Sequence, residues 1–261
     1  MARAAVPGRL TWRVATVKEA KDETATARTL TLDVPGWPGH NPGQHVAVKL
    51  TAADGYTAQR DYSIASAWPT CASEPDRLEI TVQRFADGEV SPYLAEIAEP
   101  GDQFDVRGPI GGWFTWDPSD PRPLLLFAGG SGIVPLMSMI RTHAQSGAKV
   151  PVRLIYSART PADVIYQDEL SQRQRVSPLT ITYLYTRSGW ATRGIAPAKD
   201  SKSYTTRLNA KILAETVFPA SANPVTFVCG PSGFVEAASS LLVAAGHAPG
   251  AIKTERFGPG G

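Results

Sequence analysis

The stretch Arg60–Ser66 (RDYSIAS) puts a cation, an aromatic ring and hydroxyl groups on seven consecutive residues. On a β-strand, side chains two residues apart share a face, so we expect Arg60 and Tyr62 on one face and Asp61 and Ser63 on the other. A guanidinium can hold phosphate, a flat ring can pack on a second ring, and a small hydroxyl can bond to a ring edge. A flavin nucleotide needs this combination. Taken alone, however, the stretch reads better as an ordinary exposed strand, so its surroundings must decide.

Around this stretch, residues 9–115 alternate apolar and polar side chains in short runs. Turn formers such as Pro35-Gly36 and Asp54-Gly55 separate the runs. This period of two predicts antiparallel strands with one solvated face. About six strands in this length favour a small barrel or sandwich, with one helix near residues 92–99. The alternation is carried by Leu10, Trp12, Val14, Leu30, Leu32, Val34, Val46, Val48, Leu50, Leu78, Ile80 and Val82.

The pattern changes after residues 117–123 (DPSDPRP), where three prolines in seven residues predict a stiff linker. Continuous apolar runs then occupy residues 124–128, 152–156, 181–185 and 225–229. Such runs are typical of parallel strands buried on both faces, and helical patterns lie between them. We therefore expect an N-terminal antiparallel β-barrel domain, residues 1–118, and a C-terminal doubly wound parallel-sheet α/β domain, residues 119–261.

A possible phosphate-binding segment lies in the β half at Gly88, Glu89, Val90 and Ser91, just before a proline and a short apolar segment. Serine at the N-cap followed by proline predicts a helix start, and the free N–H groups of a helix start attract phosphate. Glu89 would sit close to such an anion and is expected to turn outward. A capped surface helix would be the simpler interpretation if Arg60 were not in the same half.

Two glycine-containing turns follow apolar runs in the α/β half, GGSG at residues 129–132 and CGPS at residues 229–232. Each has the strand, turn and helix order that dinucleotide sites require. Ligands of parallel sheets bind at the carboxyl ends of the strands, so we expect both turns at one cleft. The nucleotide-binding residues predicted from them are Gly130, Ser131, Gly132, Cys229, Gly230 and Pro231.

Arginines follow two of the apolar runs. Arg187 and Ser188 come after residues 181–185 with Arg193 close behind, and Arg159 follows residues 152–156. A 2′-phosphate requires cations where a plain ribose prefers an acid, and no Asp or Glu occupies the loop that carries Arg187. These residues favour NADPH over NADH. The preference is modest, because arginines are common on protein surfaces.

Composition excludes several function classes. The net charge of +2 does not favour a nucleic-acid partner, and no P-loop or GxSxG motif is present. Two cysteines, Cys71 and Cys229, cannot supply the four thiolates of an iron–sulfur cluster, and the four histidines lack metal-ligand spacing. We expect no metal site. No segment has the apolar length of a membrane span or the apolar core of a leader, so a soluble cytoplasmic protein is expected.

Seven motifs in this order resemble those of the ferredoxin–NADP(+) reductase superfamily over nearly the whole chain. They are PGQ (42–44), RDYSIAS (60–66), GEVSPYL (88–94), GPIGGWF (108–114), AGGSGIVP (128–135), VCGP (228–231) and ERF (255–257). The resemblance implies an FAD-binding barrel, with FMN as the less favoured flavin, and an NAD(P)-binding α/β domain. It implies that Arg60 and residues 88–91 hold the flavin phosphates.

The resemblance also implies roles around the reacting rings. Tyr62 would pack against the isoalloxazine and Ser63 would bond near flavin N5. Cys229 would lie beside the nicotinamide and shape the hydride-transfer geometry without acting as a nucleophile. Glu255 would relay a proton or orient Ser63, and Phe257 would cover the flavin or border the nicotinamide.

Two further segments are expected to be structural. GPIGGWF should form a glycine-rich corner filled by its two aromatic side chains, which join the two halves. Ser66 should support the flavin strand without touching the flavin ring.

The leading functional hypothesis is an FAD-dependent NAD(P)H reductase that serves a separate ferredoxin, oxygenase or similar redox protein. It would have no iron–sulfur domain of its own. The alternative is a flavin-binding electron-transfer subunit with little NAD(P)H activity. These two hypotheses differ in whether NAD(P)H alone reduces the flavin.

Overall fold

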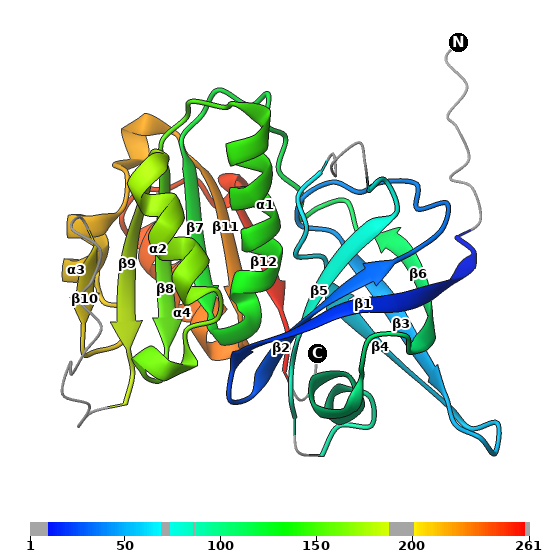
Figure 1. Ribbon diagram of the computed structural model, residues 1–261. Helices are drawn as coiled ribbons and strands as arrows, with labels where there is room; N and C mark the ends of the chain where they lie inside the picture. The colour runs from blue at the N-terminus through cyan, green and yellow to red at the C-terminus, as the bar shows by residue number, and fades with distance from the viewer. Residues whose placement is uncertain (1–9, 69–73, 86, 188–200, 259–261) are drawn as a thin grey trace, which may run out of the picture.

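The computed structural model describes residues 10–68, 74–85, 87–187 and 201–258. It contains two six-stranded sheets, one in each half of the chain, that lie side by side (Figure 1). The first sheet is antiparallel and the second parallel, as the two hydrophobic patterns predict.

The N-terminal sheet has the strand order β4-β3-β6-β1-β2-β5. An isolated bridge between Ile64 and Ile80 links the segment after β4 to β5, so the two edge strands meet and the sheet curls into a barrel. Inward side chains such as Leu30, Leu32 and Val46 are fully buried in its core. Its elements are β1 Trp12–Thr24, β2 Ala27–Asp33, β3 His45–Thr51, β4 Thr57–Ser63, β5 Arg77–Gln83, the π-helical turn η1 Tyr93–Ile97, and β6 Gln103–Ile110.

The C-terminal sheet has the order β10-β9-β8-β7-β11-β12, with helices on both faces. The chain starts in β7, builds outward to β10 and then returns to place β11 on the other side of β7. Its strands are β7 Leu124–Gly129, β8 Val152–Ala158, β9 Leu179–Tyr185, β10 Lys202–Tyr204, β11 Val225–Gly230 and β12 Ile252–Arg256. Its helices are α1 Ile133–Ser146, α2 Gln167–Val176, α3 Ala210–Thr216 and α4 Ser232–Ala244, with short 3-10 turns at Gly130–Gly132, Pro161–Asp163, Ala220–Ala222 and Pro249–Ala251.

Alternation along β7 explains why this strand is apolar throughout. Leu124 and Leu126 belong to the core under α1 and α2, whereas Leu125 and Phe127 belong to the core under α3 and α4. Every residue of β7 and β11 is buried. A strand covered on both faces has no solvated position to mark its period, which is why the sequence shows a continuous run.

The GPIGGWF corner was predicted only in part. Phe114 is buried and packs edge-to-face on Phe227 of β11, with ring centroids 5.2 Å apart, so it joins the two halves. Trp113 is 64% exposed, and the prediction that both aromatic side chains fill the corner is wrong. Lys253 lies close to both the Trp113 and Phe227 rings and donates to the Thr115 carbonyl, so one aromatic ring and one lysine stem share the space.

Candidate functional site

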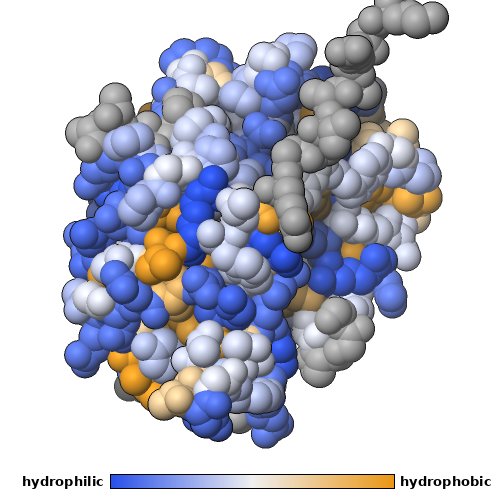
Figure 2. Space-filling model, turned by 90° about the vertical axis from the view of Figure 1, so that its right-hand side faces the viewer, coloured by the Kyte–Doolittle hydropathy of each residue, from blue (hydrophilic) through white to orange (hydrophobic). Residues whose placement is uncertain are grey.

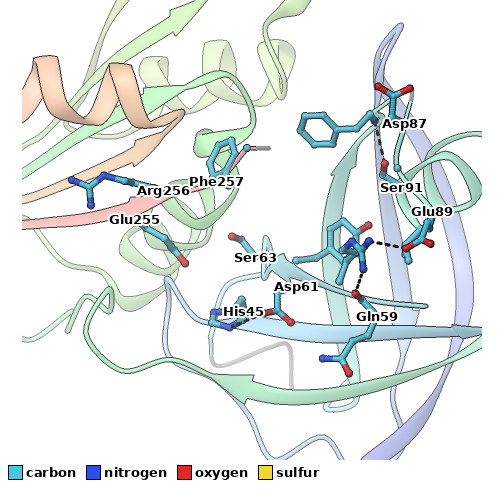
Figure 3. A pocket seen from close by; sticks show the side chains of 16 residues that line it. His45, Gln59, Asp61, Ser63, Asp87, Glu89, Ser91, Glu255, Arg256 and Phe257 are labelled. Atoms are coloured by element: carbon cyan, nitrogen blue, oxygen red, sulfur yellow. Dashed lines mark hydrogen bonds and ion pairs between the residues drawn. The ribbon is translucent and has the colours of Figure 1, made fainter. Parts of the chain in front are cut away.

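A pocket of about 800 Å³ lies between the two halves of the molecule (Figure 3). Its walls come from β4, from the loop between β5 and η1, and from the end of β12. The structure brings these predicted residues together in the lining: Arg60, Tyr62, Ser63, Gly88, Glu89, Val90, Ser91, Glu255 and Phe257. They lie up to about two hundred positions apart in the sequence, and the order of motifs was the signal that grouped them.

The β4 strand lines the pocket with consecutive residues, Gln59 to Ser63. Strict alternation would place only every second residue on one side. β4 is an edge strand of the sheet, and Gln59, Arg60 and Asp61 are all exposed along it. Tyr62 is half-buried against the barrel core, and burial raises the pKa of its hydroxyl well above the ordinary value.

Arg60 already has an anionic partner. Its Nη2 lies 2.7 Å from Oε2 of Glu89, while the hydroxyl of Tyr56 donates to the other carboxylate oxygen at 2.8 Å. The hydrogen bonds from Tyr56 and Arg60 lower the pKa of the Glu89 carboxyl. Glu89 was predicted to turn outward, and the structure shows it exposed but directed at Arg60. The two exposed groups form a pair that an incoming phosphate must rearrange or share.

Ser91 does not cap the helix as predicted. Its Oγ accepts the backbone N–H of Phe85 at 3.1 Å, and Ser91 itself is buried. The hydroxyl therefore ties together the loop between β5 and η1, and no helix N–H is satisfied by it. The side chain of Val90 is also buried, in the barrel core, so only its backbone can face a ligand.

Ser63 and Glu255 reach the pocket from the two halves of the molecule, and Figure 3 shows their side chains approaching each other. Oε2 of Glu255 is buried and has no hydrogen-bond partner within the described residues. Desolvation raises the pKa of this carboxyl to about 7. A buried polar atom without a partner is rare, and its position beside the pocket suits a site whose ligand supplies the missing bond.

Cys229 stands next to Glu255, because β11 and β12 pair in parallel with these two residues in register. The thiol is completely buried, and burial, followed by the nearby Glu255 carboxylate, raises its pKa well above the ordinary value. A neutral thiol is a poor nucleophile, which agrees with the predicted shaping role. Cys229 does not line the pocket itself.

The GGSG turn has the predicted context, with β7 before it and α1 after it. Gly130 has φ +54°, a left-handed conformation that glycine adopts without strain. A Cβ on Gly132 would collide with the backbone of Cys229. The two turns are thus in contact where the sheet order reverses between β7 and β11, the switch point at which ligands of α/β sheets bind.

The remaining predicted nucleotide residues lie outside the pocket lining. Gly130, Ser131, Gly132, Gly230 and Pro231 form the adjoining turns at the carboxyl ends of β7 and β11.

The predicted arginines follow the next two strands. Arg159 and Arg187 are exposed after β8 and β9, and the backbone N–H of Arg187 donates to the Arg159 carbonyl. Asp163 accepts a hydrogen bond from Arg159 at 2.5 Å, an acidic neighbour that the sequence argument overlooked. Ser188 and Arg193 lie outside the described residues.

Several pocket residues were missed by the sequence reasoning, among them His45, Asp61, Phe85 and Arg256. His45 pairs with Ser63 across β3 and β4, and its Nε2 lies 3.9 Å from Asp61. Burial lowers the pKa of His45. Its position directly after the PGQ motif was the available signal, but the cross-strand pairing that brings it to Ser63 requires the register.

The fold and its two nucleotide-type regions define a flavin- and nicotinamide-dependent oxidoreductase. Residues 13–115 match the oxidoreductase FAD-binding domain and residues 126–240 match the oxidoreductase NAD-binding domain. The chain belongs to the ferredoxin–NADP(+) reductase superfamily and is an FAD- and NAD(P)H-binding oxidoreductase of the ferredoxin reductase type.

Curated relatives include reductase components of oxygenases. The chain is 32% identical to the glycine betaine monooxygenase reductase subunit of Pseudomonas aeruginosa, over 84% of this chain and 56% of the relative. It is 31% identical to the ferredoxin reductase component of 3-ketosteroid-9-alpha-monooxygenase of Mycobacterium tuberculosis, over 87% and 60%. The chain therefore spans little more than half the length of these relatives.

Solved structures share the fold. The FAD/NAD-binding domain of nitric oxide dioxygenase from Vibrio cholerae has a TM-score of 0.80 and 24% identity, with 95% of this chain and 99% of that chain covered. A ferredoxin NADP+ reductase from Neisseria gonorrhoeae, solved with FAD and NADP, has a TM-score of 0.74 and 21% identity, with 94% and 98% covered. No helix in the described part of the chain is long and apolar enough to cross a membrane.

Proposed function

We propose that this protein takes electrons from NAD(P)H onto bound FAD and passes them to a separate redox protein, such as a ferredoxin or an oxygenase component. One observation carries the proposal. The edge strand of the barrel and the last strand of the parallel sheet converge on one pocket, with Ser63 opposite Glu255 and the dinucleotide-type turns beside it. The oxygenase reductase subunits among the relatives support the choice of acceptor class.

On the flavin side, Arg60 and the backbone of residues 88–91 would hold the pyrophosphate. Tyr62 would pack on the isoalloxazine, and Ser63 would hydrogen-bond near N5. These residues fit the group, because they supply a guanidinium, an aromatic ring and a hydroxyl along one pocket wall. We further propose that the flavin domain covers residues 1–118 and the nucleotide domain residues 119–261.

On the nicotinamide side, Gly130–Gly132 and Gly230–Pro231 would receive the dinucleotide, and Cys229 would limit how the nicotinamide ring can sit. Phe257 would close the pocket over the rings. When bound, FAD accepts a hydride from NAD(P)H and releases electrons singly. Glu255 would hold a proton close to Ser63, since a carboxyl with a pKa of about 7 is partly protonated at neutral pH.

We propose NADPH as the preferred donor, with Arg159 and Arg187 near the 2′-phosphate, together with Ser188 and Arg193. The two described arginines occupy neighbouring loops at the carboxyl edge of the sheet. The pairing of Arg159 with Asp163 reduces the free positive charge there, so the preference should be moderate.

Anaerobic mixing of the flavin-loaded protein with NADPH or NADH tests the proposal. Rapid bleaching of the flavin absorbance, followed by reoxidation on adding a ferredoxin or an oxygenase component, is the expected result. A yellow protein that neither nucleotide reduces would favour the alternative, an electron-transfer subunit. A protein that cannot be reconstituted with flavin would contradict both.

A further inference from the structure

Helix α1 carries three polar side chains on one face, although most of the helix is buried and apolar. They are Ser138, Arg141 and Thr142. Arg141 and Thr142 follow Ser138 by three and four residues, so both lie on the same face of the helix as Ser138. We call these three residues the α1 seam. Ser138 and Thr142 are almost completely buried, and the Arg141 side chain is 14% exposed. Buried polar groups at regular helical spacing need partners, and here the partners come from the barrel.

The α1 seam binds the backbone just after the predicted flavin strand. Ser138 Oγ donates to the Ser66 carbonyl at 2.6 Å, and Arg141 Nη1 donates to the Ala65 carbonyl at 2.9 Å. The backbone N–H of Trp68 donates to Thr142 Oγ1 at 3.1 Å. Three side chains of one helix thus hold three backbone groups within four residues of the barrel. These residues begin two positions after Ser63.

Arg141 is itself fixed from three sides. Its Nη1 lies 2.7 Å from Glu79 of β5, its Nη2 lies 2.6 Å from Glu169 of α2, and its guanidinium stacks over the Tyr166 ring at 5.1 Å. Ser66, predicted to be structural, accepts the Glu79 N–H on its hydroxyl at 3.2 Å and completes the same cluster. A guanidinium with two carboxylates and a carbonyl has little freedom to move, so the cluster fixes α1 relative to the barrel.

The other end of α1 is the GGSG turn. Ser138 follows Gly132 by six residues, which is about 9 Å along a helix. One rigid helix therefore contacts the proposed nicotinamide site at its N-terminus and the proposed flavin strand through its seam. Any shift of the seam moves one cofactor site relative to the other.

We propose that the α1 seam is a positioning device that sets the approach of the nicotinamide to the flavin. This proposal rests on the proposed function. Hydride transfer requires near van der Waals contact, and a displacement of about 1 Å can lower its rate by roughly a hundredfold. The seam residues do not line the pocket, so they act through the backbone of residues 65–68 and are not catalytic residues.

The test uses the flavin-loaded protein with the double variant Ser138→Ala/Thr142→Val, which keeps Arg141. Matched controls are Ser239→Ala and Thr226→Val. Both control hydroxyls are buried and have no hydrogen-bond partner in the described part of the chain, and they lie on α4 and β11 away from the seam. Flavin content, NADPH dissociation constant, hydride-transfer rate and the long-wavelength nicotinamide–flavin charge-transfer absorbance are measured for all three and for the wild type.

We expect the seam variant to retain flavin and to bind NADPH within about twofold of the wild type. Its hydride-transfer rate should fall at least about tenfold and its charge-transfer absorbance should weaken, while both controls stay normal. In the flavin-free protein, the Trp68 amide should lose hydrogen-exchange protection. The conservative variant Thr142→Ser keeps the hydroxyl and should have the hydride-transfer rate of the wild type. If the double variant does not fold, the single variant Ser138→Ala takes its place.

An unchanged rate and absorbance in the seam variant, with a wild type that NADPH reduces normally, would overturn the positioning role alone. A wild type that NADPH does not reduce would overturn the proposed function, and the positioning role with it. A rate that falls equally in the seam variant and the controls would assign the effect to stability and also overturn the proposal.

Discussion

Arg60 and Glu89 form an ion pair of 2.7 Å within the pocket that we assign to the flavin. The cation proposed to bind phosphate is therefore shared with an internal carboxylate, which Tyr56 holds from the other side. Figure 2 shows another face of the molecule, in which hydrophilic and hydrophobic surface is mixed. The Arg60–Glu89 pair places opposite charges at the pocket itself, an arrangement that the net charge of +2 does not describe.

Replacing Glu89 with Gln should tighten FAD binding a few-fold, because it removes a negative charge that competes with the flavin phosphates for Arg60. The salt dependence of FAD binding should also change in this variant, because salt screens the exposed Arg60–Glu89 ion pair. Quenching of flavin fluorescence during titration of the flavin-free protein measures the affinity. Tyr56→Phe keeps the carboxylate and should change affinity less. Weaker binding by the Gln variant would show instead that Glu89 holds Arg60 in a productive position.

Glu255 should make stability depend on pH. Burial raises the pKa of its carboxyl from 4.5 to about 7, so the folded protein binds more protons than the unfolded chain between these values. Stability from this group is present below pH 4.5 and is lost as pH rises through about 7. Glu255→Gln should remove this loss, which amounts to up to about 3 kcal/mol at pH 8 and vanishes near pH 4. Urea unfolding of the flavin-free protein at several pH values measures the difference, and identical pH profiles for the two proteins would contradict the assignment.

Ser63→Ala should leave FAD bound and slow its reduction by NADPH. The reason is that Ser63 lines the pocket and its hydroxyl makes no hydrogen bond to the described residues, so the hydroxyl is available to the ligand. Stopped-flow reduction measures the rate, and Ser239→Ala, a serine on α4 outside the pocket lining, is a control that should leave the rate unchanged. A normal reduction rate would remove Ser63 from the proposed role near N5.

The preference for NADPH over NADH can be tested by replacing two charged residues. Arg187→Ala should weaken NADPH binding more than NADH binding, because only NADPH carries a 2′-phosphate. Asp163→Asn should strengthen NADPH binding selectively, because it releases Arg159 from its acidic partner. Equilibrium titrations with both nucleotides give the ratios. Equal effects on NADPH and NADH in both variants would place the 2′-phosphate elsewhere.

The two halves, their strand types and the two strand–turn–helix sites could be predicted because each is encoded locally. Alternation marks the barrel strands, and the continuous run at residues 124–128 marks a buried parallel strand. Glycines mark the turn at residues 129–132, where Gly130 takes a left-handed conformation and Gly132 meets β11.

Features that depend on contacts between distant segments could not be predicted. Trp113 is as aromatic as Phe114, and only the packing on Phe227 decides which of the two is buried. One local contact was also missed, because the Ser91 hydroxyl accepts the backbone N–H of Phe85 in its own loop, whereas capping rules had favoured the following helix. The Arg60–Glu89 pair forms only because the fold brings β4 close in space to the loop after β5, and the sequence does not show this proximity.

The pocket takes its walls from both halves of the chain, with β4 on one side and the end of β12 on the other. Its occupant therefore adds a thermodynamic link between two halves that the Phe114–Phe227 contact and the α1 seam already join. Ligand bound only to the assembled state stabilises that state in proportion to the logarithm of its concentration. Cofactor supply should therefore raise the stability of both halves together, because losing the structure of either half removes a wall of the pocket.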